Sequence, residues 1–155
     1  MKPVVKKATP AAIAVLRQAT KISPSRKKVS DGLLPSKAHI NQNPNSDHNT
    51  GYAVDLTHDK ENRIDCYLIF QKLQKDPRVK YLIFNHRIWT PEKGVDVYTG
   101  SNPHVKHIHI SIKEDCGNDT SPWFAWLDKP KHTTVDQARL AASKIKPLPK
   151  KKAKK

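Results

Sequence analysis

Histidine is the residue type in this chain with the most chemistry to offer. Two of the histidines, His107 and His109, alternate with Ile108, Ile110 and Ile112. A strand places such alternate side chains on the same face, so both imidazoles lie opposite three isoleucines. A lone strand histidine is usually an ordinary hydrogen-bonded residue, but this pair indicates metal binding or proton transfer. The full set of histidines is His39, His48, His58, His86, His104, His107, His109 and His132.

A second cluster of chemically capable residues runs from Ser46 to Asp55. Within it, His48 precedes Asp55 by seven residues. Imidazole nitrogen and carboxylate oxygen bind Zn²⁺ at about 2.0 to 2.2 Å, and a catalytic zinc takes three protein ligands with one position open for water. His48, Asp55 and one histidine of the later strand would complete such a set. Gly51 permits a tight turn between the first two ligands.

These residues resemble a known pair of motifs. The segment from Ser46 to Asp55 matches S-x-H-x-x-G-x-A-x-D at every fixed position, and residues 107–109 match the downstream H-x-H. Together they resemble the zinc D-Ala-D-Ala carboxypeptidase and L-alanyl-D-glutamate endopeptidase family (peptidase family M15), which shares its fold with the Hedgehog signalling domain. The resemblance covers roughly residues 25 to 128. Three further segments are similar to a phage endolysin branch: SDG at residues 30–32, NHRIW at residues 85–89 and YTGSNPHVKHIHISI at residues 98–112.

The resemblance implies a set of site residues. Zinc would be held by His48, Asp55 and His109. His107 would lie beside the metal rather than on it, and Ser46 would orient the substrate or a ligand.

One family feature is missing. In much of the family an acidic residue three places before the last zinc histidine acts as general base, but Lys106 occupies that place here. The murein endopeptidase branch has H-x-x-H-x-H instead, which His104, His107 and His109 reproduce, so His104 is the candidate base. A neutral imidazole near the metal can take up the proton of an activated water. Arg26 is a candidate for pairing a substrate carboxylate, although a solvated loop cation is the simpler interpretation.

Two histidines flank the first motif, and one further acidic residue lies within it. His39 and His58 are candidates for groups that orient a ligand or for a second metal site, although lone histidines in polar loops are usually neither. Asp47 is expected to face solvent beside His48.

The elements that must position these residues follow from turn residues and hydrophobic spacing. Thr9 and Pro10 predict the start of a helix that ends by Ser23, and residues 25–49 read as a long loop. The remaining predicted elements are strands at 52–56, 79–84, 87–90 and 106–112, and helices at 64–75 and 133–143. The fold class is therefore α+β, a small antiparallel sheet with flanking helices, and the resemblance implies a Hedgehog/DD-peptidase-like fold. The expected domains are an N-terminal helical segment (1–24), the zinc peptidase domain (25–128), a closing helix (129–143) and a disordered basic tail (144–155).

Composition narrows the function classes. The 155 residues carry a formal net charge of +15, and 36% of them are apolar. No apolar run is long enough for a membrane span or a secretory signal. Together with this, the resemblance to phage endolysins implies location in the host cytoplasm until release to the cell wall. Two cysteines, Cys66 and Cys116, make no disulfide framework. Seven lysines among the last twelve residues predict an electrostatic contact with an anionic polymer such as the cell wall.

The sequence therefore predicts a monomeric zinc peptidase that cuts an amide bond in the stem peptide or cross-link of peptidoglycan. Two alternatives stay open. One is a metal-dependent nuclease, which the positive charge and the histidines would suit. The other is a zinc-stabilised binding module without catalysis, which the missing acid before His109 would suit.

Overall fold

The computed structural model describes residues 3–127. The chain divides into two compact units, of which the first ends at Phe124 and the second begins at Ala125. The helix predicted at 133–143 and the basic tail at 144–155 lie outside the described residues. Within residues 3–127, no helix combines the length and the apolar composition needed to cross a bilayer.

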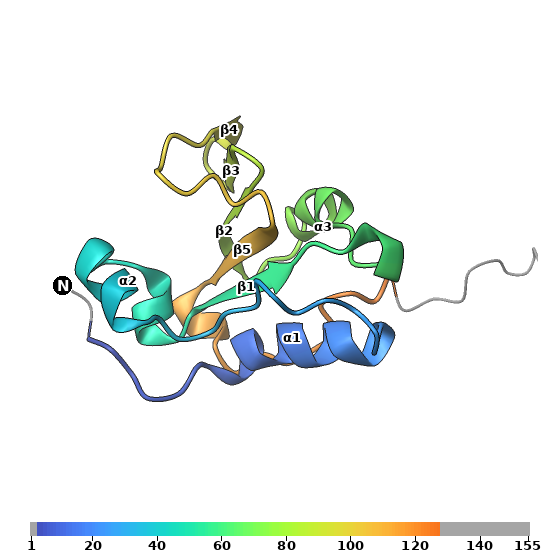
Figure 1. The fold of residues 1–155 in the computed structure, drawn as a ribbon, viewed down its shortest axis with the longest axis horizontal. Coiled ribbons are helices and arrows are strands. Elements are labelled where there is room, and N and C mark those ends of the chain that lie inside the picture. The colour runs from blue at the N-terminus through green and yellow to red at the C-terminus, as the bar shows by residue number, and fades with distance from the viewer. Residues whose placement is uncertain (1–2, 128–155) are drawn as a thin grey trace, which may run out of the picture. The chain divides into compact units, whose positions relative to one another are not determined.

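The first unit is a mixed helix and sheet structure, which confirms the α+β prediction (Figure 1). Its five strands form one antiparallel sheet in the order β1-β5-β2-β3-β4. The strands are β1 (Ala53–Thr57), β2 (Val79–Phe84), β3 (Arg87–Thr90), β4 (Gly94–Val97) and β5 (His107–Ile112). The α-helices are α1 (Pro10–Ile22), α2 (Lys37–Gln42) and α3 (Cys66–Leu73), and the 3-10 helices are η1 (Asp47–Thr50), η2 (Lys60–Asn62) and η3 (Glu114–Cys116).

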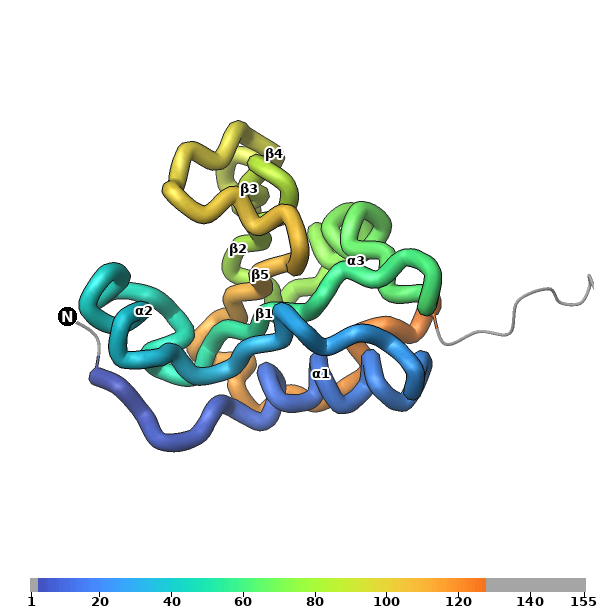
Figure 2. The backbone as a smooth tube through the Cα atoms, viewed as in Figure 1, coloured from blue at the N-terminus to red at the C-terminus, as the bar shows by residue number. Residues whose placement is uncertain are grey.

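One face of the sheet carries the hydrophobic core. The three isoleucines of β5 are buried there, as predicted, and their cross-strand neighbours Val54, Leu56 and Leu82 share that face. Helices α1 and α3 supply the apolar side chains that cover it. In Figures 1 and 2, α1 runs beside β1, and the strands succeed one another away from it, so that the β3–β4 hairpin lies farthest from α1. The opposite face of β1 and β5 is left for polar residues.

Helix α1 begins and ends where the sequence predicts. The Thr9 hydroxyl accepts a hydrogen bond from the Ala12 N–H, Pro10 occupies the first turn, and Ser23 closes the helix. Its buried face consists mainly of alanines, which let the helix approach the sheet closely. The Trp123 indole N–H donates to the Ala11 carbonyl at 3.1 Å, which links the first turn of the helix to a distant part of the chain.

Helix α3 is shorter than the predicted 64–75. It begins after Asp65, whose carboxylate accepts a hydrogen bond from the Tyr67 N–H, and it ends at Leu73. Ile69 and Phe70 are buried at the predicted helical spacing. The hydrophobic pattern thus predicted the helix, and the capping residue set its start.

The segment 25–49 is not the continuous loop that the sequence predicts. It contains α2, which the Ser36 hydroxyl caps by accepting a hydrogen bond from the His39 N–H. Helix α2 has no buried residue, so it carries no hydrophobic periodicity that could reveal it. Strand β4 was also missed, because it is short and three of its four residues are exposed.

The SDG segment fastens this region to β1. Gly32 and Asp55 exchange two backbone hydrogen bonds, of 3.1 and 2.8 Å. The Asp31 carboxylate accepts hydrogen bonds from the Thr57 N–H at 3.0 Å and the Thr57 hydroxyl at 2.7 Å. It also receives both terminal nitrogens of Arg26, at 3.1 and 2.7 Å. One carboxylate therefore joins residues 26–32 to the strand that carries Asp55.

We expect Asp31→Ala to lower the free energy of unfolding by about 3 kcal/mol, because it leaves the buried Arg26 guanidinium without its partner. Urea denaturation measures the change. The matched control is Glu92→Ala, which removes the same charge from an exposed position. Equal free energies of unfolding in the two variants would contradict the role of Asp31 in joining residues 26–32 to β1.

Candidate metal centre

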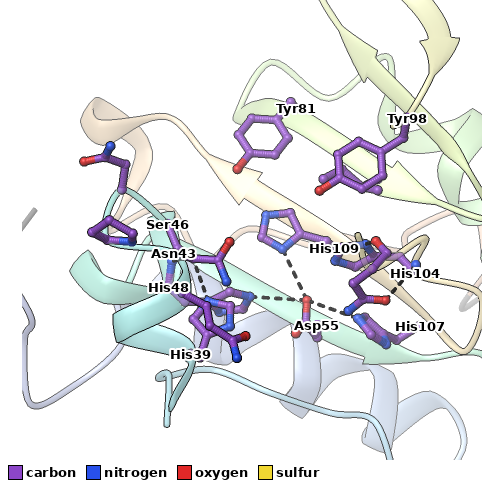
Figure 3. Close-up of a pocket in the computed structure, with 15 residues that line it drawn as sticks. His39, Asn43, Ser46, His48, Asp55, Tyr81, Tyr98, His104, His107 and His109 are labelled. Carbon is purple, nitrogen blue, oxygen red and sulfur yellow. Dashed lines mark hydrogen bonds and ion pairs between the residues drawn. The ribbon is translucent and has the colours of Figure 1, made fainter. Parts of the chain in front are cut away.

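Three side chains from separate segments converge on the polar face of the sheet. Asp55 of β1 stands directly opposite His109 of β5 in the antiparallel register, and His48 approaches from η1. The Asp55 Oδ1 atom lies 3.3 Å from His48 Nε2 and 3.3 Å from His109 Nδ1. Ligand atoms of the three residues all lie within 4.8 Å of one another. Figure 3 shows Asp55 between His48 and His107, with His109 facing the same carboxylate.

Helix η1 places His48 by local geometry. The Ser46 hydroxyl accepts a hydrogen bond from the His48 N–H, which caps η1 at its start. Gly51 ends η1 with φ of 81°, a left-handed conformation that glycine adopts most easily. A side chain there would also meet the backbone of Ala8 at 3.0 Å. The fixed serine and glycine of the motif therefore serve the turn that delivers the histidine.

His48 and His109 are each oriented by a hydrogen bond at the ring nitrogen that faces away from Asp55. The His48 Nδ1–H donates to the Leu33 carbonyl at 2.8 Å, which leaves the Nε2 lone pair toward Asp55. The His109 Nε2 lies 2.9 Å from the Ser111 hydroxyl, and donation to that oxygen leaves the Nδ1 lone pair toward Asp55. Metal-binding histidines commonly use the second nitrogen in this way.

The arrangement fits a divalent cation. Asp55 Oδ1 is buried and has no hydrogen-bond partner among residues 3–127. A cation between these three groups would stabilise the arrangement, since an unpaired buried carboxylate oxygen is costly. A cation of the kind that binds two imidazoles and one carboxylate would satisfy all three.

The same contacts decide the charges of the cluster. Burial alone would raise the pKa of the Asp55 carboxyl, but His109 and His48 outweigh it and hold this pKa well below its usual range. Burial alone would lower the pKa of His48, but the adjacent Asp55 and the Leu33 carbonyl outweigh it and raise this pKa. The carboxylate is therefore ionised and ready to bind a cation.

A cavity of about 460 Å³ opens over this cluster. His104 and His107 line it, on the other side of Asp55 from His48 (Figure 3). Their rings lie 4.9 Å apart, and the ring of His104 lies 5.7 Å from that of His109. The sequence prediction that these histidines gather at one site is consistent with this geometry.

Both additional histidines are neutral near pH 7. Burial, followed by the neighbouring His109 and His107, lowers the pKa of His104 to about 4. Burial likewise lowers the pKa of His107. The His104 Nδ1–H donates to the Asn102 carbonyl at 2.6 Å, so the Nε2 atom keeps a free lone pair.

The two predicted substrate-binding residues, Arg26 and Ser46, both make hydrogen bonds within the protein. Arg26 does not line the cavity: its guanidinium is buried and bound to Asp31, so it has no free edge for a substrate carboxylate. Ser46 does line the cavity, but its hydroxyl caps η1 and lies 3.2 Å from His39 Nε2. Ser46 thus helps to position His48, and whether it meets a substrate stays a prediction.

Three further expectations can be compared with the structure. Asp47 does not face solvent, because its buried carboxylate pairs with Lys80 at 3.1 Å. His58 does not line the cavity, and its Nδ1 accepts a hydrogen bond from the Cys66 N–H at the start of α3. His39 lines the cavity and faces the His48 ring at 5.6 Å.

Comparison of the chain with protein-family models, curated proteins and solved structures gives no significant match. Membership of the peptidase family that the motifs resemble is therefore a proposal, supported by the motifs and the geometry of the cluster.

Sequence reasoning missed the groups that orient the ligands and shape the cavity. The Leu33 carbonyl leaves no signal, because a backbone group is common to every residue. Ser111 did leave a signal in the sequence, since it follows His109 by two positions on the same face of β5. Tyr81 of β2 pairs with Ser111 of β5, so its side chain lies on the same face of the sheet.

We expect Ser111→Ala to weaken Zn²⁺ affinity roughly 10- to 100-fold, because the His109 ring loses the bond that fixes its orientation. Competition with a chromophoric chelator measures the affinity. Ser101→Ala, at an exposed position, is the matched control. An unchanged affinity in Ser111→Ala would show that His109 is held by other contacts.

Proposed function

We propose that this protein is a zinc-dependent peptidoglycan peptidase, similar to phage endolysins, that hydrolyses an amide bond in the stem peptide or cross-link of the bacterial cell wall. One observation carries the proposal. Two imidazole nitrogens and one buried carboxylate oxygen face one another at the wall of a cavity that neutral histidines also line.

Zinc fits this donor set better than the other common divalent ions. Mg²⁺ and Ca²⁺ prefer shells made wholly of oxygen, whereas two imidazoles and a carboxylate are a frequent ligand set of catalytic zinc. His48, Asp55 and His109 would hold the ion, and the cavity lies beside them. When bound, zinc supplies Lewis acidity, which acidifies a water molecule and polarises a carbonyl group.

His104 is the proposed proton acceptor. The Asn102 carbonyl holds the proton on Nδ1, so Nε2 carries a lone pair. A neutral imidazole can take a proton from an attacking water and deliver it to the leaving amine. Lys106 cannot do this while it is a cation.

His107 is the proposed partner of the substrate carbonyl. Its ring lies beside the metal ligands, with Nε2 3.8 Å from Asp55 Oδ1. An imidazole N–H at this place can donate to a carbonyl oxygen as negative charge develops on it.

The cavity wall suits a peptide. It includes the side-chain amides of Gln42 and Asn43, which can donate to and accept from peptide groups. It also includes Tyr81, whose burial raises the pKa of its phenol to about 12, so the hydroxyl keeps its proton. Neutral polar walls of this kind can bind an uncharged stretch of stem peptide. The antiparallel sheet with two ligands on adjacent strands also supports the Hedgehog/DD-peptidase-like fold that the motifs imply.

We expect the protein to release free amino groups from purified peptidoglycan when it is loaded with zinc, and to lose this activity after chelation and in Asp55→Ala. Amino groups are measured by derivatisation of the soluble fragments, and the same samples are incubated with DNA. Cleavage of DNA without release of amino groups would support the nuclease alternative. Tightly bound zinc with neither activity would support a binding module.

We expect His104→Ala to keep the metal but lose roughly 10²- to 10⁴-fold in cleavage rate, the usual contribution of a general acid or base. Because His104 has φ of 57°, His104→Asn is the companion variant, as asparagine tolerates this conformation. Lys106→Ala is the matched control, since Lys106 is exposed two residues away. Wild-type rates in both His104 variants would assign proton transfer to another residue.

A further inference from the structure

Asp55 faces a second pair of histidines besides its first two neighbours. Asp55, His104 and His107 also offer ligand atoms that lie within 4.8 Å of one another. All three are half-buried, whereas His48 and His109 are buried. Figure 3 shows this second group on the far side of the carboxylate from His48.

The second pair has nitrogens available for a ligand. His104 Nε2 is free because Nδ1 is bound to the Asn102 carbonyl. His107 Nε2 lies 3.8 Å from Asp55 Oδ1, a distance that a shared cation would bridge.

We infer that His104, His107 and Asp55 form a second zinc site, which binds more weakly than the first and shares its carboxylate. The inference rests on the proposed first site, because Asp55 belongs to both. In two-metal sites the ions typically lie about 3.5 to 4 Å apart and share bridging oxygen ligands. The structure therefore assigns to one cavity a tight site and an outer site.

The outer site is the weaker of the two. Its ion adds no new carboxylate, since Asp55 is already shared, and it is repelled by the ion in the first site. It is also more exposed to water.

Occupation of the outer site has a functional consequence. A zinc ion on His104 Nε2 takes the lone pair that the proposed proton transfer needs. Excess zinc therefore inhibits the enzyme that the first zinc ion activates, and the cell-wall activity depends on zinc concentration with a maximum near one equivalent.

Equilibrium dialysis against increasing Zn²⁺, with the bound metal measured by mass spectrometry, tests this inference. We expect about two equivalents at saturation in the wild type and about one in His104→Asn and in His107→Ala, with the tight phase retained. We expect His48→Ala to lose the tight phase and Asp55→Ala to lose both. The matched control is His39→Ala, a histidine of the same cavity outside both groups, which retains two. Circular dichroism checks that each variant is folded.

The outcomes separate the inference from the proposed function. One equivalent in the wild type at saturation, still dependent on His48 and Asp55, would overturn the second site and leave the first intact. Two equivalents in His104→Asn and in His107→Ala would overturn it as well. Absence of any bound zinc in the wild type would overturn the proposed function itself.

Discussion

The candidate site depends on one carboxylate whose Oδ1 atom is buried. Asp55 Oδ1 lies 3.3 Å from an imidazole nitrogen on each of two sides and has no hydrogen bond of its own within residues 3–127. A folded protein tolerates such a group when a cation or a proton compensates it. The contacts around it maintain this arrangement: His48 is held by the Leu33 carbonyl and His109 by Ser111. These contacts thus hold three donor groups close enough for one cation to bind them together.

Strand register turns this local arrangement into a property of the whole fold. The pairing of Asp55 with His109 puts both on the polar face, while their neighbours Val54 and Ile110 pair on the core face. A slip of one residue would exchange the two faces, which the loss of buried isoleucine area forbids. The hydrophobic core that α1 and α3 cover therefore fixes the position of Asp55 and His109, the two candidate ligands on the sheet. Gly32 contributes as well, because a Cβ atom there would lie 3.3 Å from Asp55 Oδ2.

Much of this was predictable from the sequence. Alternation of histidine and isoleucine predicted both β5 and the common face of His107 and His109. Thr9 and Pro10 predicted the start of α1, and short runs of strand-forming residues predicted β1 and β2. What escaped prediction depends on contacts between distant segments or on elements without a buried stripe. Helix α2 buries no residue, and Arg26 pairs with a carboxylate that also holds Thr57, so neither the helix nor the lost substrate role left a local signal. The similarity of motifs supplied the choice of His48 and Asp55, which composition alone left open.

The central claim is that His48, Asp55 and His109 bind zinc. Crystals grown with one equivalent of Zn²⁺ test it directly through an anomalous difference map at the zinc absorption edge. The account predicts one dominant peak at about 2.0 to 2.2 Å from His48 Nε2, His109 Nδ1 and an Asp55 oxygen. A dominant peak held by other side chains, or no peak in the cavity, would contradict it.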